Sequence, residues 1–473
     1  MKKQNKMKWD KQWMSHFMHR PHAKLDIVVA AILICFFGYL FLAFPVVRLG
    51  DTFQYENQFV TREPVYPLVI QLLRFLTPHY DKVLVFLQNA FTAVAIFVFW
   101  RFVRQEFCLN IVTSFVVLAG LLVQYILTPI MSESGLIMTN AILTEGFSIP
   151  LFLLFIMFLL KAVWYEQKRF QNQCISFGIA FVLSLIRGQM MVLLIAWAII
   201  FGIQCLVKKK YIAIVKIALL IIIAFVGRSY TARIYNYLEQ GYFVDTVSSK
   251  AMMLANVLYV SDREDGEVIA DEGLRELFYE IYDTMEENGA TYQYAESGLI
   301  NRAMHSEHVH EDINFNYFTT ANDAYLDRTR GINASDFMLL RITTDEVASA
   351  LMAELLPEVL PKFIYNYIAL AIVGFIRTVA VVHPLLNWYA IVAYLAAFVL
   401  CLVRLKQEKN SRAAKFMLIT LLLICGTVFG TAMMIQCISR YMIYNFPIFY
   451  ISGLLMLLEC YEYNKKRGER DGL

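Results

Sequence analysis

The chain has 473 residues, of which 59% are hydrophobic and only 17% are charged, and its mean hydropathy is +0.53. Soluble chains are about one quarter charged, so this composition excludes soluble, fibrous and disordered proteins. The formal net charge of +3 is too small to indicate a nucleic-acid partner. The sequence predicts an all-α polytopic membrane protein.

The N-terminal region, residues 1–26, is basic, and the apolar run that follows it is too long for the core of a cleavable signal peptide. We therefore expect this run to form the first membrane-spanning helix. Further apolar segments that could span a membrane or lie along its surface follow in the chain. In order, the segments are 27–47, 83–100, 111–130, 141–160, 175–186, 189–206, 211–227, 363–382, 388–403, 416–435 and 442–458.

Basic residues between these segments indicate the topology. If the N-terminus is cytoplasmic, alternating crossings bring Arg101, Lys161 and Lys208 to the cytoplasmic side, as the positive-inside rule requires. The C-terminal tail, residues 461–473, is also basic and also expected in the cytoplasm, so the number of crossings must be even. We expect about 10 transmembrane helices, within a range of 10–11. An alternative topology joins 175–206 into one broken span and puts the acidic region that follows it in the cytoplasm.

Segment 363–382 is the one that does not fit alternating crossings. Pro357 and Pro361 precede it, and Arg377 interrupts its apolar run. These features favour an interfacial or re-entrant helix that does not cross the membrane.

The polar region of residues 228–362 holds 24 of the 39 Asp and Glu residues of the chain, and its apolar residues have helix-like spacing. We expect it to form an acidic, mostly helical extracytoplasmic domain. The complete division is a cytoplasmic N-terminus 1–26, an N-terminal transmembrane module 27–227 with a first external loop 48–82, the acidic insert 228–362, a C-terminal transmembrane module 363–460 and a cytoplasmic tail 461–473.

The first external loop combines a carboxylate with aromatic and basic side chains. Asp51 follows the first span, and Tyr55, Arg62 and Tyr66 come before a short apolar run at 68–76 that should lie in the membrane interface. This combination suits a site for a polar ligand at the membrane surface. The structural alternative is that Asp51 caps a turn while Arg62 extends to lipid phosphate.

Four charged residues lie inside or at the outer end of apolar segments: Glu145, Arg187, Arg377 and Arg440, the last followed by Tyr441. An ionisable side chain inside a membrane costs at least about 2.5 kcal/mol and usually marks a binding site or a pathway. Arginine binds phosphate oxygens through two parallel N–H donors, so converging arginines favour a site for a phosphate-bearing lipid. The alternative is ion pairing between helices, for instance between Glu145 and one of the arginines.

Several short motifs occur in a characteristic order. They are Asp51 in the first loop, the turn Arg62-Glu-Pro-Val-Tyr-Pro-Leu, Leu143-Thr-Glu-Gly at the start of the fourth span, Leu185-Ile-Arg187 and Ser439-Arg-Tyr441. In this order and on this side of the membrane, they resemble the GT-C membrane glycosyltransferases, which include the protein mannosyltransferases and the aminoarabinose lipid A transferase. The resemblance covers residues 25 to about 230 and 385–460 and leaves the acidic insert uncovered.

The resemblance implies transfer of a sugar from a polyprenyl-phosphate donor to a glycan, lipid or protein acceptor. Asp51 would be the general base that takes the proton of the acceptor hydroxyl, while Arg187 and Arg440, with Arg62, would stabilise the departing lipid phosphate. Many relatives carry an acidic pair where Thr52 follows Asp51 here. The sequence therefore gives no support for a divalent metal, and we expect no cofactor.

The remaining expected substrate-binding residues are Tyr55, Tyr66, Glu145, Arg377 and Tyr441. The basic N-terminus and lysine-rich loops suggest a bacterial inner (plasma) membrane, whose lipids surround the protein, with the active site on the extracytoplasmic face. A lipid-linked glycan flippase or other transporter is the alternative from another class, and O-antigen-type polymerases and ligases share the topology. A transporter should place its charges along a path near the midplane, whereas a transferase should gather them at one face.

Overall fold

The computed structural model describes residues 23–131 and 136–471. Within these ranges the secondary structure is helical, apart from one isolated parallel bridge between Val47 and Ala141. Nine of the described helices are long and apolar enough to span a membrane. The predicted class, an all-α polytopic membrane protein, is therefore confirmed.

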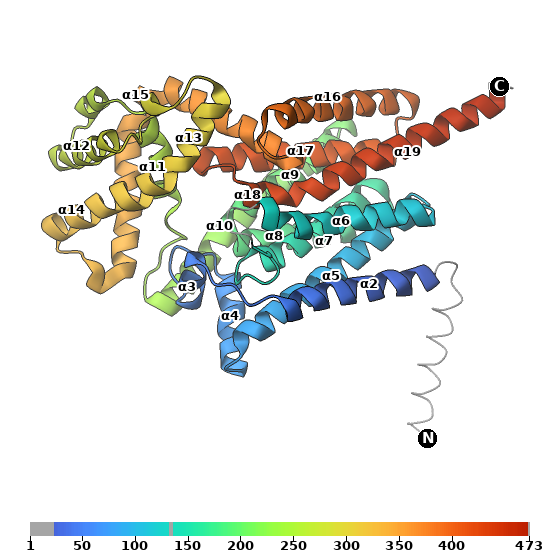
Figure 1. The fold of residues 1–473 in the computed structure, drawn as a ribbon, viewed down its shortest axis with the longest axis horizontal. Helices are drawn as coiled ribbons and strands as arrows, with labels where there is room; N and C mark the ends of the chain where they lie inside the picture. Colours follow the sequence, from blue (N-terminus) through green and yellow to red (C-terminus); the bar gives the residue numbers. More distant parts are fainter. Residues whose placement is uncertain (1–22, 132–135, 472–473) are drawn as a thin grey trace.

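Long helices lie side by side in a bundle, and a group of shorter helices covers one of its ends (Figure 1). We call the second group the cap, the end that it covers the cap end, and the opposite end the far end. The bundle helices are α2 (Ala23–Ala43), α5 (Tyr80–Glu106), α6 (Ile111–Met131), α7 (Glu145–Trp164), α8 (Arg169–Ile186), α9 (Met191–Val207), α10 (Tyr211–Gln240), α16 (Pro384–Gln407), α17 (Arg412–Met434) and α19 (Phe446–Asp471).

The cap and the loops of the cap end contain the remaining helices. The cap comprises α11 (Ser249–Val260), η2 (Arg263–Val268), α12 (Glu272–Glu287), η3 (Tyr292–Tyr294), α13 (Leu299–Glu311), the π-helix η4 (Asp312–Thr319), α14 (Thr320–Arg330), η5 (Ala334–Asp336) and the first part of α15 (Phe337–Val379). The loops contain α3 (Gly50–Glu56), α4 (Val65–Leu76), η1 (Gly188–Met190), α18 (Ser439–Met442) and η6 (Ile443–Asn445).

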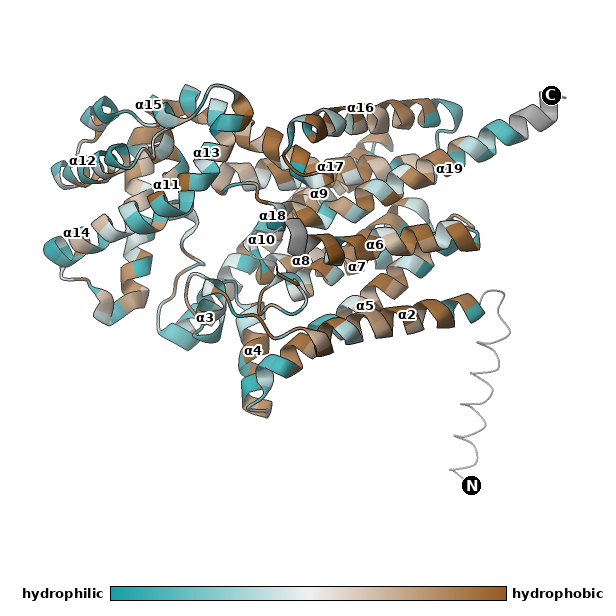
Figure 2. Cartoon of the chain, viewed as in Figure 1, coloured by the Kyte–Doolittle hydropathy of each residue, from teal (hydrophilic) through white to brown (hydrophobic). Residues whose placement is uncertain are grey.

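Apolar side chains occur all around the bundle helices. Phe99 and Phe152 belong to the buried core of the bundle, while Leu42 and Ile212 are exposed on its outer surface. A helix can present such a surface to lipid because its backbone hydrogen bonds are satisfied within the helix. Figure 2 shows that the bundle is predominantly hydrophobic and that the cap is more hydrophilic.

The basic loops that the sequence predicted on one side of the membrane lie together at the far end. Arg412 on α17 donates to Glu106 of α5 at 2.8 Å. Lys208, which follows α9, lies 3.7 Å from Glu166 in the loop between α7 and α8. The predicted grouping of these loops at one end of the bundle is therefore confirmed.

Helices α8 and α9 form an antiparallel hairpin. Trp197 Nε1 on α9 donates to Ser176 Oγ on α8 at 3.0 Å, and Arg187 lies at the turn between the helices. The two halves of 175–206 therefore pass beside each other. The alternative topology, in which this stretch forms one broken span, is wrong.

Two predicted domain boundaries fall inside continuous helices. The boundary at 227/228 lies within α10, which extends to Gln240, and the boundary at 362/363 lies within α15. We expected Pro357 and Pro361 to precede a separate helix at 363–382. Instead, both lie inside α15, which is 43 residues long. Each helix that joins the bundle to the cap continues through the region where the composition changes, so the change in composition does not coincide with the end of a helix.

The second half of α15 stays at the cap end. Lys362 lies 3.6 Å from Asp265 of η2, and Arg377, 15 residues further along α15, binds Glu307 of α13. Both partners belong to the cap. Although α15 is long and apolar enough to span a membrane, these contacts fit the expectation that segment 363–382 does not cross it.

Cysteine labelling tests this topology. In a variant without the native cysteines, single cysteines replacing Glu358 and His383 should both react with a membrane-impermeant maleimide added to one side of the membrane. The exposed Lys409 at the far end provides the control, and a cysteine there should react only after the membrane is permeabilised. Labelling of positions 358 and 383 from opposite sides would contradict the arrangement.

Candidate functional site

A short stretch of parallel backbone pairing joins the loop after α2 to the loop before α7. Val47 N donates to Asn140 O at 2.9 Å, and Ile142 N donates to Val47 O at 3.0 Å. The side-chain amides of Gln88 and Asn89 on α5 donate to further carbonyl groups of the second loop. Irregular buried backbone needs such partners because an unpaired peptide group costs free energy. The pairing fixes where α3 and α7 begin.

Asp51 lies in the first turn of α3, between two guanidinium groups. The neighbouring Thr52 donates to Ile142 O at 3.1 Å, which anchors the start of the helix. Asp51 Oδ1 accepts a hydrogen bond from Arg62 Nη2 at 2.6 Å, and Oδ2 accepts one from Arg440 Nη2 at 3.2 Å. Asp51 thus joins the first loop to α18, which is nearly four hundred residues away in the sequence.

Glu145, the first residue of α7, joins two arginines behind Asp51. Arg187 Nη1 lies 2.6 Å from Glu145 Oε1, and Arg440 Nε donates to the same oxygen. The Arg187 guanidinium also lies over the ring of Tyr441, 4.7 Å from its centroid. Arg440 therefore bridges the two carboxylates Glu145 and Asp51.

We call Asp51, Arg62, Glu145, Arg187 and Arg440 the charge cluster. Its three arginines and two carboxylates leave a surplus of one positive charge. Burial alone would raise the pKa of Asp51, but Arg62 and Arg440 outweigh this effect and hold the pKa below its ordinary value. The Asp51 side chain is 28% exposed, whereas that of Glu145 is 0% exposed. Asp51 is therefore the ionised carboxylate of the cluster that a ligand can contact.

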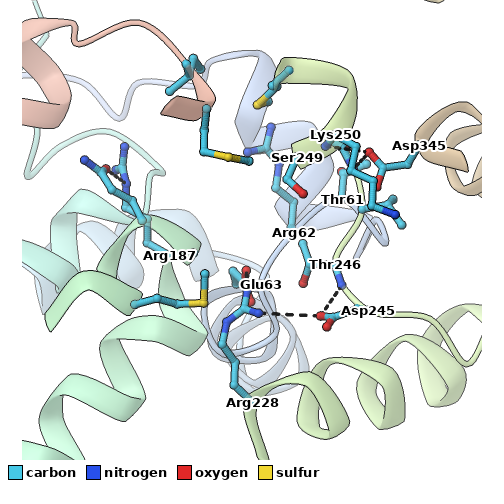
Figure 3. A pocket seen from close by; sticks show the side chains of 18 of the residues that line it. Thr61, Arg62, Glu63, Arg187, Arg228, Asp245, Thr246, Ser249, Lys250 and Asp345 are labelled. Atoms are coloured by element: carbon cyan, nitrogen blue, oxygen red, sulfur yellow. Dashed lines mark hydrogen bonds and ion pairs between the residues drawn. The ribbon is translucent and has the colours of Figure 1, made fainter. Parts of the chain in front are cut away.

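The charge cluster forms one wall of a cavity of about 950 Å³ between the bundle and the cap. Figure 3 shows Arg187 on one side of this cavity and Thr61, Lys250 and Asp345 on the other. A third wall is apolar and comes from α9 and α17. It includes Met191, Val192, Ile195, Met434 and Ile435. The cavity thus combines an ionic wall with a hydrophobic one.

A second ion pair in the wall was not predicted from the sequence. Glu63 binds Arg228 of α10, and Arg228 Nη1 lies 3.9 Å from Asp245 (Figure 3). Burial raises the pKa of Glu63 to about 7, although Arg228 acts in the opposite direction. Glu63 stands beside Arg62 in the sequence and Arg228 ends an apolar run, but no sequence pattern indicates that they meet.

Most of the predicted site residues meet at this cavity. Those that line it are Asp51, Tyr55, Arg62, Arg187, Arg440 and Tyr441. Glu145 lies directly behind the wall, bound to two of the lining arginines. Tyr66 is buried behind Tyr55, with ring centroids 5.1 Å apart, and donates to Gln88 Oε1 at 2.9 Å. Tyr66 therefore supports the wall without lining the cavity.

The structure does not bring Arg377 to this site. Its guanidinium binds Glu307 of α13 and donates to Cys437 O at 3.1 Å. This arrangement joins the end of α15 to the cap and to the loop before α18. The expectation that Arg377 belongs to the ligand site therefore requires correction, because sequence position at the membrane surface does not fix the direction in which a helix end faces.

Within residues 23–131 and 136–471, no three His, Cys, Asp or Glu side chains gather closely enough to hold a metal ion. Asp51 and Glu145 instead have arginine partners.

Replacement of Glu145 tests the charge cluster. Glu145→Gln removes the buried negative charge between Arg187 and Arg440, and breaking a buried ion pair by removing one partner costs about 3–5 kcal/mol. We expect a clearly lower midpoint of thermal unfolding for the purified protein. Asp283→Asn is the control, because its ion pair with Arg263 is exposed and such pairs contribute at most about 1 kcal/mol. Equal stability of the two variants would refute a buried, compensated network.

No protein-family model, curated protein or solved structure matches this chain.

Proposed function

We propose that this protein is a membrane glycosyltransferase of GT-C type. It transfers a sugar from a polyprenyl-phosphate donor to a hydroxyl group of an extracytoplasmic glycan, lipid or protein. The observation that carries the proposal is Asp51, an accessible carboxylate between two arginines in a cavity that also has an apolar wall.

Asp51 suits the role of general base toward the acceptor. In the proposed reaction, the acceptor oxygen attacks the anomeric carbon of the sugar while the hydroxyl proton passes to Asp51. The bond between that carbon and the phosphate oxygen breaks, and its electron pair stays with the lipid phosphate. A base must be deprotonated at the working pH, and the lowered pKa of Asp51 meets this requirement.

The arginines suit the departing phosphate. The charge cluster has a surplus of one positive charge, so an anionic group is attracted to it. A guanidinium has five N–H donors, and those of Arg187 and Arg440 that are not bound to Glu145, Asp51 or neighbouring side chains remain able to bind phosphate oxygens. Because Glu145 already fixes both arginines, little reorganisation accompanies the development of charge on the phosphate.

The apolar wall suits a lipid-linked donor. Met191, Val192 and Ile195 follow one another on α9, and Ile195 is exposed at the surface of the bundle as well as lining the cavity. A hydrocarbon chain on this wall would replace contacts with water by apolar contacts. The sugar phosphate of the same molecule would then lie toward the charge cluster.

The position of the charges favours transfer over transport. The charge cluster lies where the loops of the bundle meet the cap, and it joins α3, α7, α18 and the turn after α8. A flippase or other transporter would be expected to carry its charged residues along a path near the midplane. Polymerases and ligases of O-antigen type would use the same donor chemistry with a different acceptor. We place the protein in a bacterial inner membrane with this site on the extracytoplasmic face.

Asp51→Asn tests the general base. The substitution keeps the size of the side chain but removes its ability to accept a proton, so transfer from a polyprenyl-phosphate sugar should fall by at least about 100-fold while donor binding survives. Asp81→Asn is a matched control, because Asp81 is 29% exposed, lies 3.5 Å from Arg48 and does not line the cavity. Undiminished transfer by the Asp51→Asn protein would exclude Asp51 as the general base, and absence of transfer by the wild-type protein would favour a transporter.

Substitution of Arg440 tests the phosphate-binding role. Arg440→Ala should weaken donor binding by roughly tenfold or more as well as slow transfer, because a hydrogen bond to a charged group contributes about 1.5–3 kcal/mol. Arg440→Lys keeps the charge that compensates Glu145 but loses the planar donor pair, so it should restore stability without restoring full affinity. Arg48→Ala, at an exposed arginine outside the cavity, should leave donor affinity unchanged. Unchanged donor binding in both Arg440 variants would exclude Arg440 as a phosphate ligand.

A further inference from the structure

A second, smaller pocket of about 230 Å³ adjoins the main cavity. The two share Thr61, Arg62, Ser248, Met252 and Asp345 as lining residues. The second pocket lies between the first loop and the cap, on the side of the main cavity where Figure 3 shows Thr61 and Asp345. A ligand in the second pocket would therefore be next to the space that Asp51 faces.

The π-helix η4 forms one side of this pocket. It contributes Asn314, Phe315 and Thr319. In a π-helix, residues five apart face the same side, because the backbone bonds connect positions i and i+5, and such segments are rare and frequently occur at functional sites. The unusual helix thus brings an amide, an aromatic ring and a hydroxyl group to one pocket.

Two buried polar atoms on lining residues have no hydrogen-bond partner among the described residues. Asn314 is only 3% exposed, and its Oδ1 atom lacks a donor. Arg341 Nε lacks an acceptor, although the other end of the same guanidinium binds Asp323. A buried polar atom without a partner is costly, and both residues line the second pocket. A ligand hydroxyl group is both a donor and an acceptor, so hydroxyl groups supply what these two atoms lack.

Aromatic rings form another part of the pocket. Phe59, Phe315 and Phe337 come from the first loop, η4 and the start of α15. The rings of Phe59 and Phe337 are 5.1 Å apart, and Phe315 and Phe337 are both exposed to solvent. Exposed rings offer apolar faces against which the C–H groups of a ligand can pack.

The charges around the pocket are already compensated. Arg62 binds Asp51, and Arg341 binds Asp323. Asp345 Oδ1 accepts hydrogen bonds from the backbone N–H groups of Ser248 and Lys250 at the start of α11. Each of these charged side chains already has a partner within the protein, so the chemistry of this pocket suits a neutral ligand.

We propose that the second pocket binds a neutral, hydroxyl-bearing ring such as that of a sugar. Its C–H faces pack on the aromatic side chains, and its hydroxyl groups bind Asn314 and Arg341. If the proposed transferase function holds, on which this assignment of role rests, the ring belongs to the acceptor, whose attacking hydroxyl then lies toward Asp51. The acceptor is accordingly a glycan or a glycosylated molecule.

Saturation-transfer NMR can test the binding without any transfer assay. The full-length protein would be placed in nanodiscs prepared without glycosidic detergents, whose head groups would compete. The probes are methyl α-mannoside, methyl β-glucoside and methyl β-galactoside. At least one should receive saturation from the wild-type protein, and Asn314→Leu and Phe315→Ala should each weaken its affinity by about tenfold or more.

Matched variants separate this pocket from unspecific effects. Asn316→Leu changes an exposed asparagine of the same π-helix that does not line the pocket, and Phe170→Ala removes an exposed ring of α8. Neither should alter glycoside binding. Phe315 is exposed, so Phe315→Ala preserves the test if Asn314→Leu fails to fold.

Two results would overturn the proposal: no glycoside binds the wild-type protein, as expected of a pocket that holds only water, or binding persists undiminished in both pocket variants. The outcome is independent of the proposed reaction. Glycoside binding together with full transfer by Asp51→Asn would leave the pocket established and refute the role of Asp51 as general base. Loss of transfer in Asp51→Asn, with no glycoside bound by the wild-type protein, would support Asp51 as general base and refute the pocket proposal.

Discussion

A carboxylate buried where membrane helices end is stable only if cations compensate it, and Glu145 has two such cations in Arg187 and Arg440. These three residues belong to the start of α7, the turn between α8 and α9, and the short helix α18. Arg440 extends the network to Asp51 on α3. One buried charge therefore holds together four segments that are distant in the sequence, and the shape of the cavity depends on their mutual positions.

The two carboxylates of the cluster have different environments and hence different capacities. Glu145 is fully buried and forms ion pairs with protein side chains, whereas part of the Asp51 side chain is exposed at the cavity surface. Both carboxylates accept hydrogen bonds from arginines, but only the Asp51 carboxylate is accessible to another molecule. The enclosed carboxylate orients the arginines, and the accessible one remains open to a ligand. Such a division of roles depends on burial, because the functional groups themselves are alike.

The sequence contains enough information to identify the bundle and most of the ionic wall. Long apolar runs predict spanning helices, and a charge beside such a run is costly enough to require a partner, which is why Asp51, Glu145, Arg187 and Arg440 could be grouped. Arg377 satisfies the same criterion and yet has its partner in the cap. The pairing of Glu63 with Arg228 and the π-helical backbone of η4 depend on how loops and cap pack together. Neither feature has a periodic or compositional pattern, so neither could be predicted.

The continuity of α15 has a mechanical consequence. Its first half lines the main cavity through Ile342, Asp345 and Glu346, and its second half ends beside the loop that leads to α18. Pro357 and Pro361 lie between the two halves, and each lacks the N–H that a helix interior uses, so resistance to bending is lowest there. A bend of α15 at these prolines would shift its first half relative to the other walls of the cavity and so change the width of the cavity.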